Sequence, residues 1–185
     1  MSVQRFVESG RAGKWLRILI VAAVMISITF IGAVGPARAG GTMQIAGIGY
    51  PVPEGASECN GAGLPVGHEY HFATRLDGDL VGCQYVFVES YDCSPGGTYR
   101  EAGTEFYVLD GPFGQGTFST TYFFRGKFEG CSPDGGFVGA EIMGFCQHPI
   151  VAGSGTGDYE GVTGRLHFQD DVVAGNYPYT GHLKW

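Results

Sequence analysis

Residues 98–128 decide the fold, and they are TYREAGTEFYVLDGPFGQGTFSTTYFFRGKF. Two segments rich in Tyr, Phe, Val and Thr, Thr98–Leu109 and Thr117–Phe128, flank the sequence Asp110-Gly111-Pro112. Aromatic and β-branched residues favour strands, and Asp, Gly and Pro favour turns. A short turn between consecutive strands makes them antiparallel neighbours. This stretch therefore predicts a β-hairpin.

Similar segments recur at short intervals on both sides of this hairpin, and no segment after residue 39 carries an amphipathic helical period. The turn signals between them include Asp77-Gly78-Asp79 and two Ser-Pro loops, Ser94–Gly97 and Ser132–Gly136. Regular short strands with such turns are typical of an all-β barrel or sandwich. The six further strands are expected at Thr42–Tyr50, His68–Leu76, Leu80–Tyr91, Phe137–Gln147, Val162–Asp170 and Tyr177–Lys184.

The preferred architecture is an eight-stranded antiparallel barrel that is largely a meander. A sheet must protect its edges, and a meander of this length does so by curling until its first strand meets its last. Glycines within the strands, such as Gly103 and Gly126, suit the bends that closure requires. A β-sandwich is the alternative, because strand spacing alone does not separate the two.

The first 39 residues are expected to be a cleavable signal peptide. Four basic residues up to Arg17 precede an uncharged apolar run from Ile18 to Val34, and Ala37-Arg38-Ala39 provides the small-x-small pattern of a cleavage site. An uncleaved membrane anchor is the alternative, since the run is close to the shortest that can span a bilayer. Cleavage would leave residues 40–185 as a single domain, secreted or periplasmic.

Charge limits the partners of that domain. The whole chain has a formal net charge of −7, and residues 1–39 hold five of its 11 Lys and Arg residues but only one of its 18 Asp and Glu residues. The remaining domain is therefore more acidic than the whole chain. An acidic surface repels phosphate backbones and anionic lipid, so we expect no nucleic acid partner and no membrane association after cleavage.

All five cysteines lie after residue 39, where export would place them in an oxidising compartment. Disulfides are favoured over a metal site, because no two cysteines have the close spacing of zinc ligands. In a meander alternate loops share one end of the sheet, so Cys59, Cys93 and Cys131 are expected at one end and Cys83 and Cys146 toward the other. Bridges are expected within these groups, with Cys93–Cys131 the best single pair because both lie in Cys-Ser-Pro loops.

The C-terminal third carries a family resemblance. Its glycine-rich run, Gly153 to Leu166, resembles the segment G-x-G-x-[FY]-x-G-[AV]-x-G of the allene oxide cyclase and dirigent-like barrels, and two further motifs, Cys146–Ile150 and Tyr177–Leu183, are similar to a bacterial secreted branch of that group. The resemblance implies an eight-stranded barrel that holds an apolar or phenolic small molecule and guides a cyclisation or coupling without a cofactor. The motif positions are Gly153, Gly155, Gly157, Tyr159, Gly161 and Gly164.

Acidic residues among aromatic ones are the candidate pocket residues. Glu89 alternates with Tyr85 and Phe87, and Glu141 alternates with Met143 and Phe145, so each is expected to share a strand face with large apolar groups. If that face points inward, burial raises the pKa of the carboxyl and suits it to proton transfer. If it points outward, the same residues form a subunit contact or face water. Tyr85 and Tyr122 are candidate hydrogen-bond donors to a ligand.

Other chemistry has less support in the sequence. His68 and His71 lie three apart and would point to opposite faces of a strand, so no metal site is expected there. The single histidines His148, His167 and His182 are expected to be structural or surface residues. No G-x-S-x-G nucleophile elbow is present, so a hydrolase is not favoured.

The leading hypothesis is a secreted barrel that binds a small apolar or aromatic molecule and needs no cofactor. The activity that the resemblance implies is a cofactor-free cyclase or isomerase, or a dirigent-like coupling guide. The alternative is a non-catalytic structural or interaction protein of the cell envelope, held by disulfides and assembled as a homo-oligomer through its Tyr- and Phe-rich outer faces.

Overall fold

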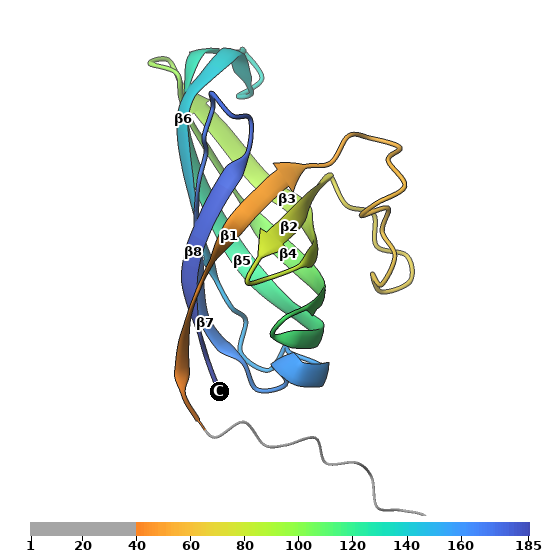
Figure 1. Ribbon diagram of the computed structural model, residues 1–185. Coiled ribbons are helices and arrows are strands. Elements are labelled where there is room, and N and C mark those ends of the chain that lie inside the picture. Colours follow the sequence, from red (N-terminus) through yellow and green to blue (C-terminus); the bar gives the residue numbers. More distant parts are fainter. Residues whose placement is uncertain (1–39) are drawn as a thin grey trace, which may run out of the picture. The chain divides into compact units, whose positions relative to one another are not determined.

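The computed structural model describes residues 40–185 as one closed, all-β barrel in which every strand is antiparallel to its neighbours in the chain (Figure 1). This confirms the predicted fold class. The signal-peptide prediction falls on residues 1–39 and lies outside the described residues. The strands are β1 (Thr42–Pro51), β2 (Phe72–Gly78), β3 (Gly82–Ser94), β4 (Thr98–Gly111), β5 (Gly114–Cys131), β6 (Phe137–Pro149), β7 (Thr163–Gln169) and β8 (Tyr177–Lys184), with a short 3-10 helix η2 (Gly157–Tyr159) before β7.

Closure depends on β1, which pairs with β2 on one side and with β8 on the other. Tyr179 on β8 reinforces this seam from inside the barrel, because its hydroxyl accepts a hydrogen bond from the Leu80 N–H at 2.9 Å and lies 3.1 Å from the Leu80 carbonyl oxygen. Its ring crosses Gly47 of β1 so closely that a Cβ there would overlap the hydroxyl. Glycine at position 47 therefore leaves the space in which Tyr179 of the last strand reaches and hydrogen-bonds Leu80 in the β2–β3 turn.

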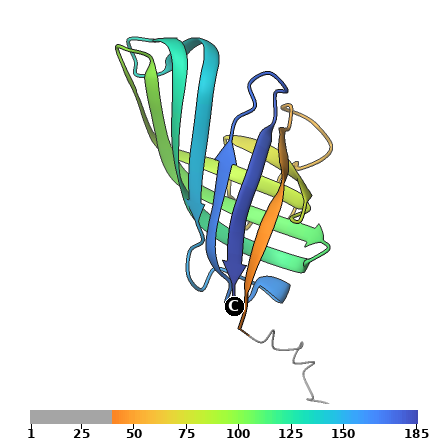
Figure 2. The ribbon, with the colours of Figure 1, turned by 60° about the vertical axis from the view of Figure 1, so that its left-hand side comes forward.

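Strands β3 to β6 are longer than the others and project past the barrel as two hairpins (Figure 2). The β3–β4 ladder continues to the pair Ser94 and Thr98, and the β5–β6 ladder continues to Cys131 and Phe137. The Cys93–Cys131 disulfide joins the two tips, which confirms the predicted pair. The end of the barrel with these tips is thus held together covalently.

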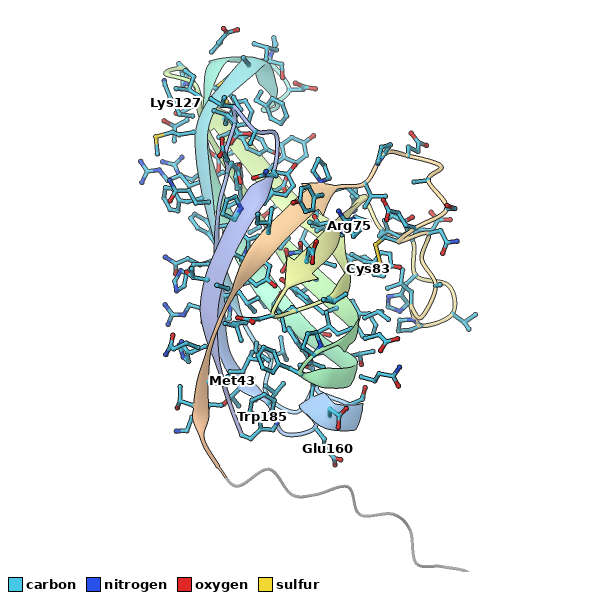
Figure 3. All side chains as sticks on the ribbon, viewed as in Figure 1. Met43, Arg75, Cys83, Lys127, Glu160 and Trp185 are labelled. Atoms are coloured by element: carbon cyan, nitrogen blue, oxygen red, sulfur yellow. A yellow bond between two sulfur atoms is a disulfide. The ribbon has the colours of Figure 1, made fainter. Side chains whose placement is uncertain are left out.

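The opposite end of the barrel is filled. Tyr107 and Phe118 stack there at 4.6 Å between ring centroids, and Tyr159 of η2 lies 5.5 Å from Phe118 and 6.5 Å from Trp185. Trp185 is labelled at this end in Figure 3. The leucines of the inner face complete an apolar core: Leu76, Leu80, Leu109, Leu166 and Leu183. These buried side chains pack against one another and fill this end of the barrel.

The second disulfide joins Cys59 to Cys83, so the predicted grouping of Cys83 with Cys146 is wrong. The segment between β1 and β2 does not stay at the end of the sheet. It returns along the outside of the barrel, over β2 and β3, which brings Cys59 to Cys83 (Figure 3). Cys146 is a buried free thiol on β6, and β6 is not a neighbour of β3.

Two disulfides fit an oxidising compartment. Over residues 40–185, no helix has the length and apolar character needed to cross a membrane.

Candidate functional site

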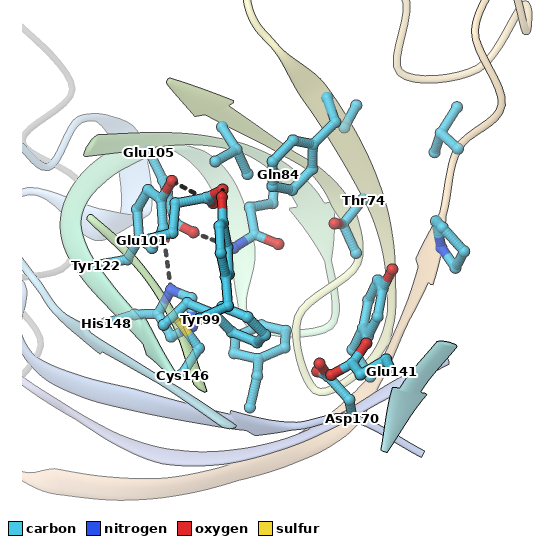
Figure 4. A pocket seen from close by; sticks show the side chains of 18 of the residues that line it. Thr74, Gln84, Tyr99, Glu101, Glu105, Tyr122, Glu141, Cys146, His148 and Asp170 are labelled. Carbon is cyan, nitrogen blue, oxygen red and sulfur yellow. Dashed lines mark hydrogen bonds and ion pairs between the residues drawn. The ribbon is translucent and has the colours of Figure 1, made fainter. Parts of the chain in front are cut away.

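The unfilled half of the barrel holds a cavity of about 350 Å³. It opens at the end of the projecting hairpins, since Phe72 and Phe137 line it and are 45% and 49% exposed. The aromatic lining consists of Phe72, Tyr99, Tyr122, Phe124, Phe128, Phe137, Phe168 and Tyr177. The polar lining consists of Thr74, Gln84, Glu101, Glu105, Glu141, His148 and Asp170 (Figure 4).

Glu105 of β4 is the centre of a buried polar network. Only 3% of the residue is exposed, and its side chain points inward with those of Tyr107 and Tyr99 because they alternate along the strand. The Gln84 amide donates to Oε1 at 2.8 Å, and the Tyr107 hydroxyl donates to Oε2 at 3.2 Å. The Thr120 hydroxyl also donates to Oε2. Donors from three neighbouring strands therefore hold this carboxylate in the wall.

His148 of β6 completes the network, with its Nδ1 2.6 Å from Glu105 Oε2. Because Glu105 already accepts from three donors, we assign this bond as Nδ1–H donating to the carboxylate. The histidine is 3% exposed, and its Nε2 is buried without a hydrogen-bond partner among the described residues. A carboxylate at Nδ1 orients the ring and leaves the Nε2 lone pair as the basic position.

Glu101, two residues along β4, holds a second network nearer the opening. The Tyr122 hydroxyl donates to its Oε1 and the Tyr99 hydroxyl to its Oε2, both at 2.7 Å. Burial, followed by these bonds to Glu101, raises the pKa of both tyrosines. Both phenols therefore stay protonated and donate their hydrogen bonds to Glu101.

Tyr99 is also the middle of an aromatic cluster at the opening. Its ring centroid lies 5.1 Å from that of Phe137 and 5.7 Å from that of Phe128, both edge to face, and 6.2 Å from that of Phe124. Phe128 and Phe137 stack on each other at 4.0 Å. These rings make the upper wall apolar and leave ring faces and edges for contact with a ligand.

Glu141 of β6 and Asp170, just after β7, point toward one another on the side of the cavity away from Glu105 (Figure 4). Oxygens of both carboxyls crowd the position that a Cβ would occupy at Gly144, so glycine at 144 makes room for the pair. Oε1 of Glu141 is buried, and no N–H or hydroxyl group of the described residues donates to it. Burial, then the hydrogen bond and charge of Asp170, raises the pKa of Glu141 to about 8, and burial raises the pKa of Asp170. The pair therefore shares a proton at neutral pH.

This shared proton predicts a stability that falls as pH rises. An unfolded Glu141 loses its proton near pH 4.3, whereas the folded pair keeps one until about pH 8, so the free energy of unfolding decreases between these values. Both side chains are partly exposed, so we expect a decrease of about 1–2 kcal/mol. Urea unfolding at about pH 5 and about pH 9 measures it.

Glu141→Gln is expected to remove most of this decrease, because the amide donates to Asp170 without carrying charge. The matched control is Glu89→Gln, which changes an exposed glutamate. An unchanged pH dependence in Glu141→Gln would show that the pair does not share a proton.

Cys146 also lines the cavity, two residues before His148 on the same face of β6. Burial, and then the negative charge of Glu105, raises the pKa of its thiol far above the ordinary value. A thiol is a poor nucleophile, so the geometry does not favour covalent catalysis by Cys146. Among the described residues, no group of three or more His, Cys, Asp and Glu side chains is arranged to hold a metal ion.

The candidate residues named from the sequence separate into two pairs. Tyr122 and Glu141 line the cavity. Tyr85 is buried on the outer face, beneath the returning β1–β2 segment, where its hydroxyl donates to the Ala62 carbonyl at 3.3 Å. Glu89 is exposed, lies at a bulge in β3 and accepts from Thr104. Tyr85 and Glu89 therefore lie outside the site.

Sequence reasoning missed Glu101, Glu105 and Asp170, and it assigned His148 a structural or surface role. A signal for the first two was present, because Glu101 and Glu105 alternate with Tyr99 and Tyr107 along β4. The same alternation test that selected Glu141 would have selected them.

Comparisons with known proteins identified no relative of this chain. No family model matches the chain, and neither the curated proteins nor the solved structures contain a match.

Proposed function

We propose that this protein binds a small, largely aromatic or apolar molecule inside the barrel. The observation that carries the proposal is the cavity of about 350 Å³, which has aromatic walls and a few convergent polar groups. Small-molecule sites in proteins combine these features, and mouths of β-barrels are common places for them. The resemblance of the glycine-rich segment to allene oxide cyclase and dirigent-like barrels supports the same proposal.

We further propose that His148 accepts a hydrogen bond or a proton from the bound molecule. Glu105 fixes the ring, and the hydrogen-bonding capacity of Nε2 is not used by any described residue. A base held in an apolar pocket suits an isomerisation or cyclisation in which a proton leaves one atom of the substrate and returns to another. Such a reaction consumes no oxidant and needs no cofactor.

The test is binding of the neutral dye Nile red, followed by its fluorescence in apolar surroundings. We expect saturable binding at one site per chain. Thr74 is buried and lines the cavity, so Thr74→Phe is expected to weaken binding about tenfold or more by filling the space. Thr74→Val, which keeps the shape of the side chain, is expected to change it less than about twofold. Absence of saturable binding, or equal binding by Thr74→Phe, would overturn the proposal.

Export through a cleavable signal peptide of residues 1–39 is part of the proposal. The two disulfides support it, because they form and persist in oxidising compartments. Sequencing the N-terminus of the protein recovered outside the cytoplasm tests it, with Gly40 as the expected first residue.

A second candidate function, assembly through the outer faces, has one specific observation in its favour. Phe123, Met143 and Phe145 are exposed on the outer faces of β5 and β6, and Phe123 and Phe145 lie on neighbouring strands. Exposed apolar groups on adjacent strands are typical of protein contacts. Light scattering on the purified protein tests it, because a monomer at all concentrations would exclude self-assembly.

A further inference from the structure

The charges around the cavity are all of one kind. Four carboxyls line it, those of Glu101, Glu105, Glu141 and Asp170, and no lysine or arginine is among the described residues of its lining. Within residues 40–185, the lysines and arginines that form ion pairs do so only with Glu58, Asp77 and Asp92, none of which lines the cavity. The carboxyls of the cavity therefore have His148 as their only basic neighbour in the lining.

The four carboxyls are not equivalent. Glu105 has His148 and three neutral donors, and Glu101 has a tyrosine hydroxyl on each oxygen. Among residues 40–185, no backbone or side-chain donor group reaches the buried Oε1 of Glu141, and the hydrogen bond between Glu141 and Asp170 is made by the proton that the two share. A buried carboxylate oxygen without a donor is costly unless a donor reaches it.

Aromatic rings line the cavity together with the carboxyl pair of Glu141 and Asp170. Phe124, Phe128, Phe137 and Tyr99 contact one another at the opening, and these four rings belong to the same lining as the carboxyl pair. Cations are attracted to the faces of aromatic rings, most strongly where water is excluded. A carboxylate pair beside aromatic rings is therefore suited to an ammonium group.

From this arrangement we infer that the ligand of the proposed site is an aromatic amine, bound with its ammonium group at Glu141 and Asp170 and its ring system along the phenylalanines. The inference rests on the proposed binding function and specifies its ligand class. A donor group at the far end of the ligand would reach toward His148, which lies farther along β6 from Glu141 and is separated from the carboxyl pair in Figure 4. Molecules with a carboxylate are expected to bind more weakly, because the acidic side chains of the lining repel them.

Three probes with one skeleton test the ligand class: naphthylethylamine, naphthylethanol and naphthylacetate. They differ in charge at the same end of the molecule, so their relative affinities isolate the electrostatic contribution. Calorimetry on the intact protein is expected to show the amine binding about tenfold or more tighter than the alcohol, and the acid weakest of the three. Equal affinities of the amine and the alcohol would overturn the inference.

Proton release gives an independent readout. An ammonium group at the pair displaces the shared proton, and the buffer takes that proton up. The binding heat of the amine is therefore expected to depend on the ionisation enthalpy of the buffer, whereas the binding heat of the alcohol is expected not to depend on it. In the variant with both Glu141→Gln and Asp170→Asn, the amine is expected to lose its preference to within about twofold of the alcohol. Glu89→Gln removes one negative charge outside the cavity and is expected to keep the preference.

Circular dichroism checks that the double variant folds. If the double variant does not fold, the single variant Glu141→Gln replaces it. The single variant is expected to lose a smaller part of the preference for the amine over the alcohol. The outcomes separate the two levels of the proposal. If Nile red binds and the amine does not bind better than the alcohol, the ligand class is wrong and the binding function stands. If neither Nile red nor any naphthyl probe binds, the binding function itself is wrong.

Discussion

Glu105→Ala is expected to lower the free energy of unfolding by about 3–5 kcal/mol. The carboxylate accepts hydrogen bonds from Gln84, Tyr107 and Thr120 and is paired with His148. All four partners are buried, so truncation leaves donors without acceptors in a place that water reaches poorly. The loss is measured by urea denaturation with the disulfides intact.

The matched control for this substitution is Glu89→Ala, which truncates an exposed glutamate of the neighbouring strand β3 and is expected to change stability by less than about 0.5 kcal/mol. Glu105→Gln keeps the shape and one acceptor but places an amide against donors, so an intermediate loss is expected. If Glu105→Ala were as stable as the original protein, the network would have no structural role and the fixed orientation of His148 would lose its explanation.

Tyr159→Ala is expected to cost about 3–5 kcal/mol, because it removes a large side chain from the filled end. Tyr159 is 1% exposed and lies between Phe118 and Trp185. No strand contributes this residue, since η2 carries it across the end of the barrel. The substitution therefore tests whether the connection before β7 is part of the core.

Tyr159→Phe is the control for this second substitution, since it keeps the ring and is expected to lose about 1 kcal/mol or less. The fluorescence of Trp185 reports on the same end of the barrel during unfolding. A loss below about 1 kcal/mol for Tyr159→Ala would mean that the end is sealed by other residues.

The strands and their order could be predicted from the sequence because each carries its own evidence. Thr98–Leu109 and Thr117–Phe128 are rich in strand-forming residues, and Asp110 and Gly111 mark the turn between them, so the hairpin needs no information from the rest of the chain. The structure extends these two strands by only a few residues, to Gly111 and from Gly114.

Which face each residue occupies was harder to predict, because one extra residue reverses the alternation. In β6 the register with β5 shifts near Phe128, so Glu141 opposite Phe128 points inward while Met143 opposite Lys127 is exposed. The expectation that Glu141 and Met143 share a face therefore fails, although Glu141 does line the cavity. In β3 a similar shift makes Glu89 the unpaired residue.

The side-chain contacts between different strands could not be predicted, because residues far apart in the sequence carry no signal that they meet. Glu105 lies on β4 and His148 on β6, and the strand between them supplies Thr120 to the same network. The Cys59–Cys83 bridge could not be predicted for the same reason. A segment without strands can return along any face of the sheet, and the meander order fixes only the strands.

The filled end of the barrel limits how a small molecule could enter and leave the cavity. Because the described barrel is filled at one end, a molecule bound in the cavity as proposed would enter and leave by the end with the projecting hairpins. Two different ligands would have to share this cavity of about 350 Å³ to be bound at the same time. Under the proposed binding function, a molecule that covers the opening beside Phe72 and Phe137 is therefore expected to compete with every ligand of the cavity.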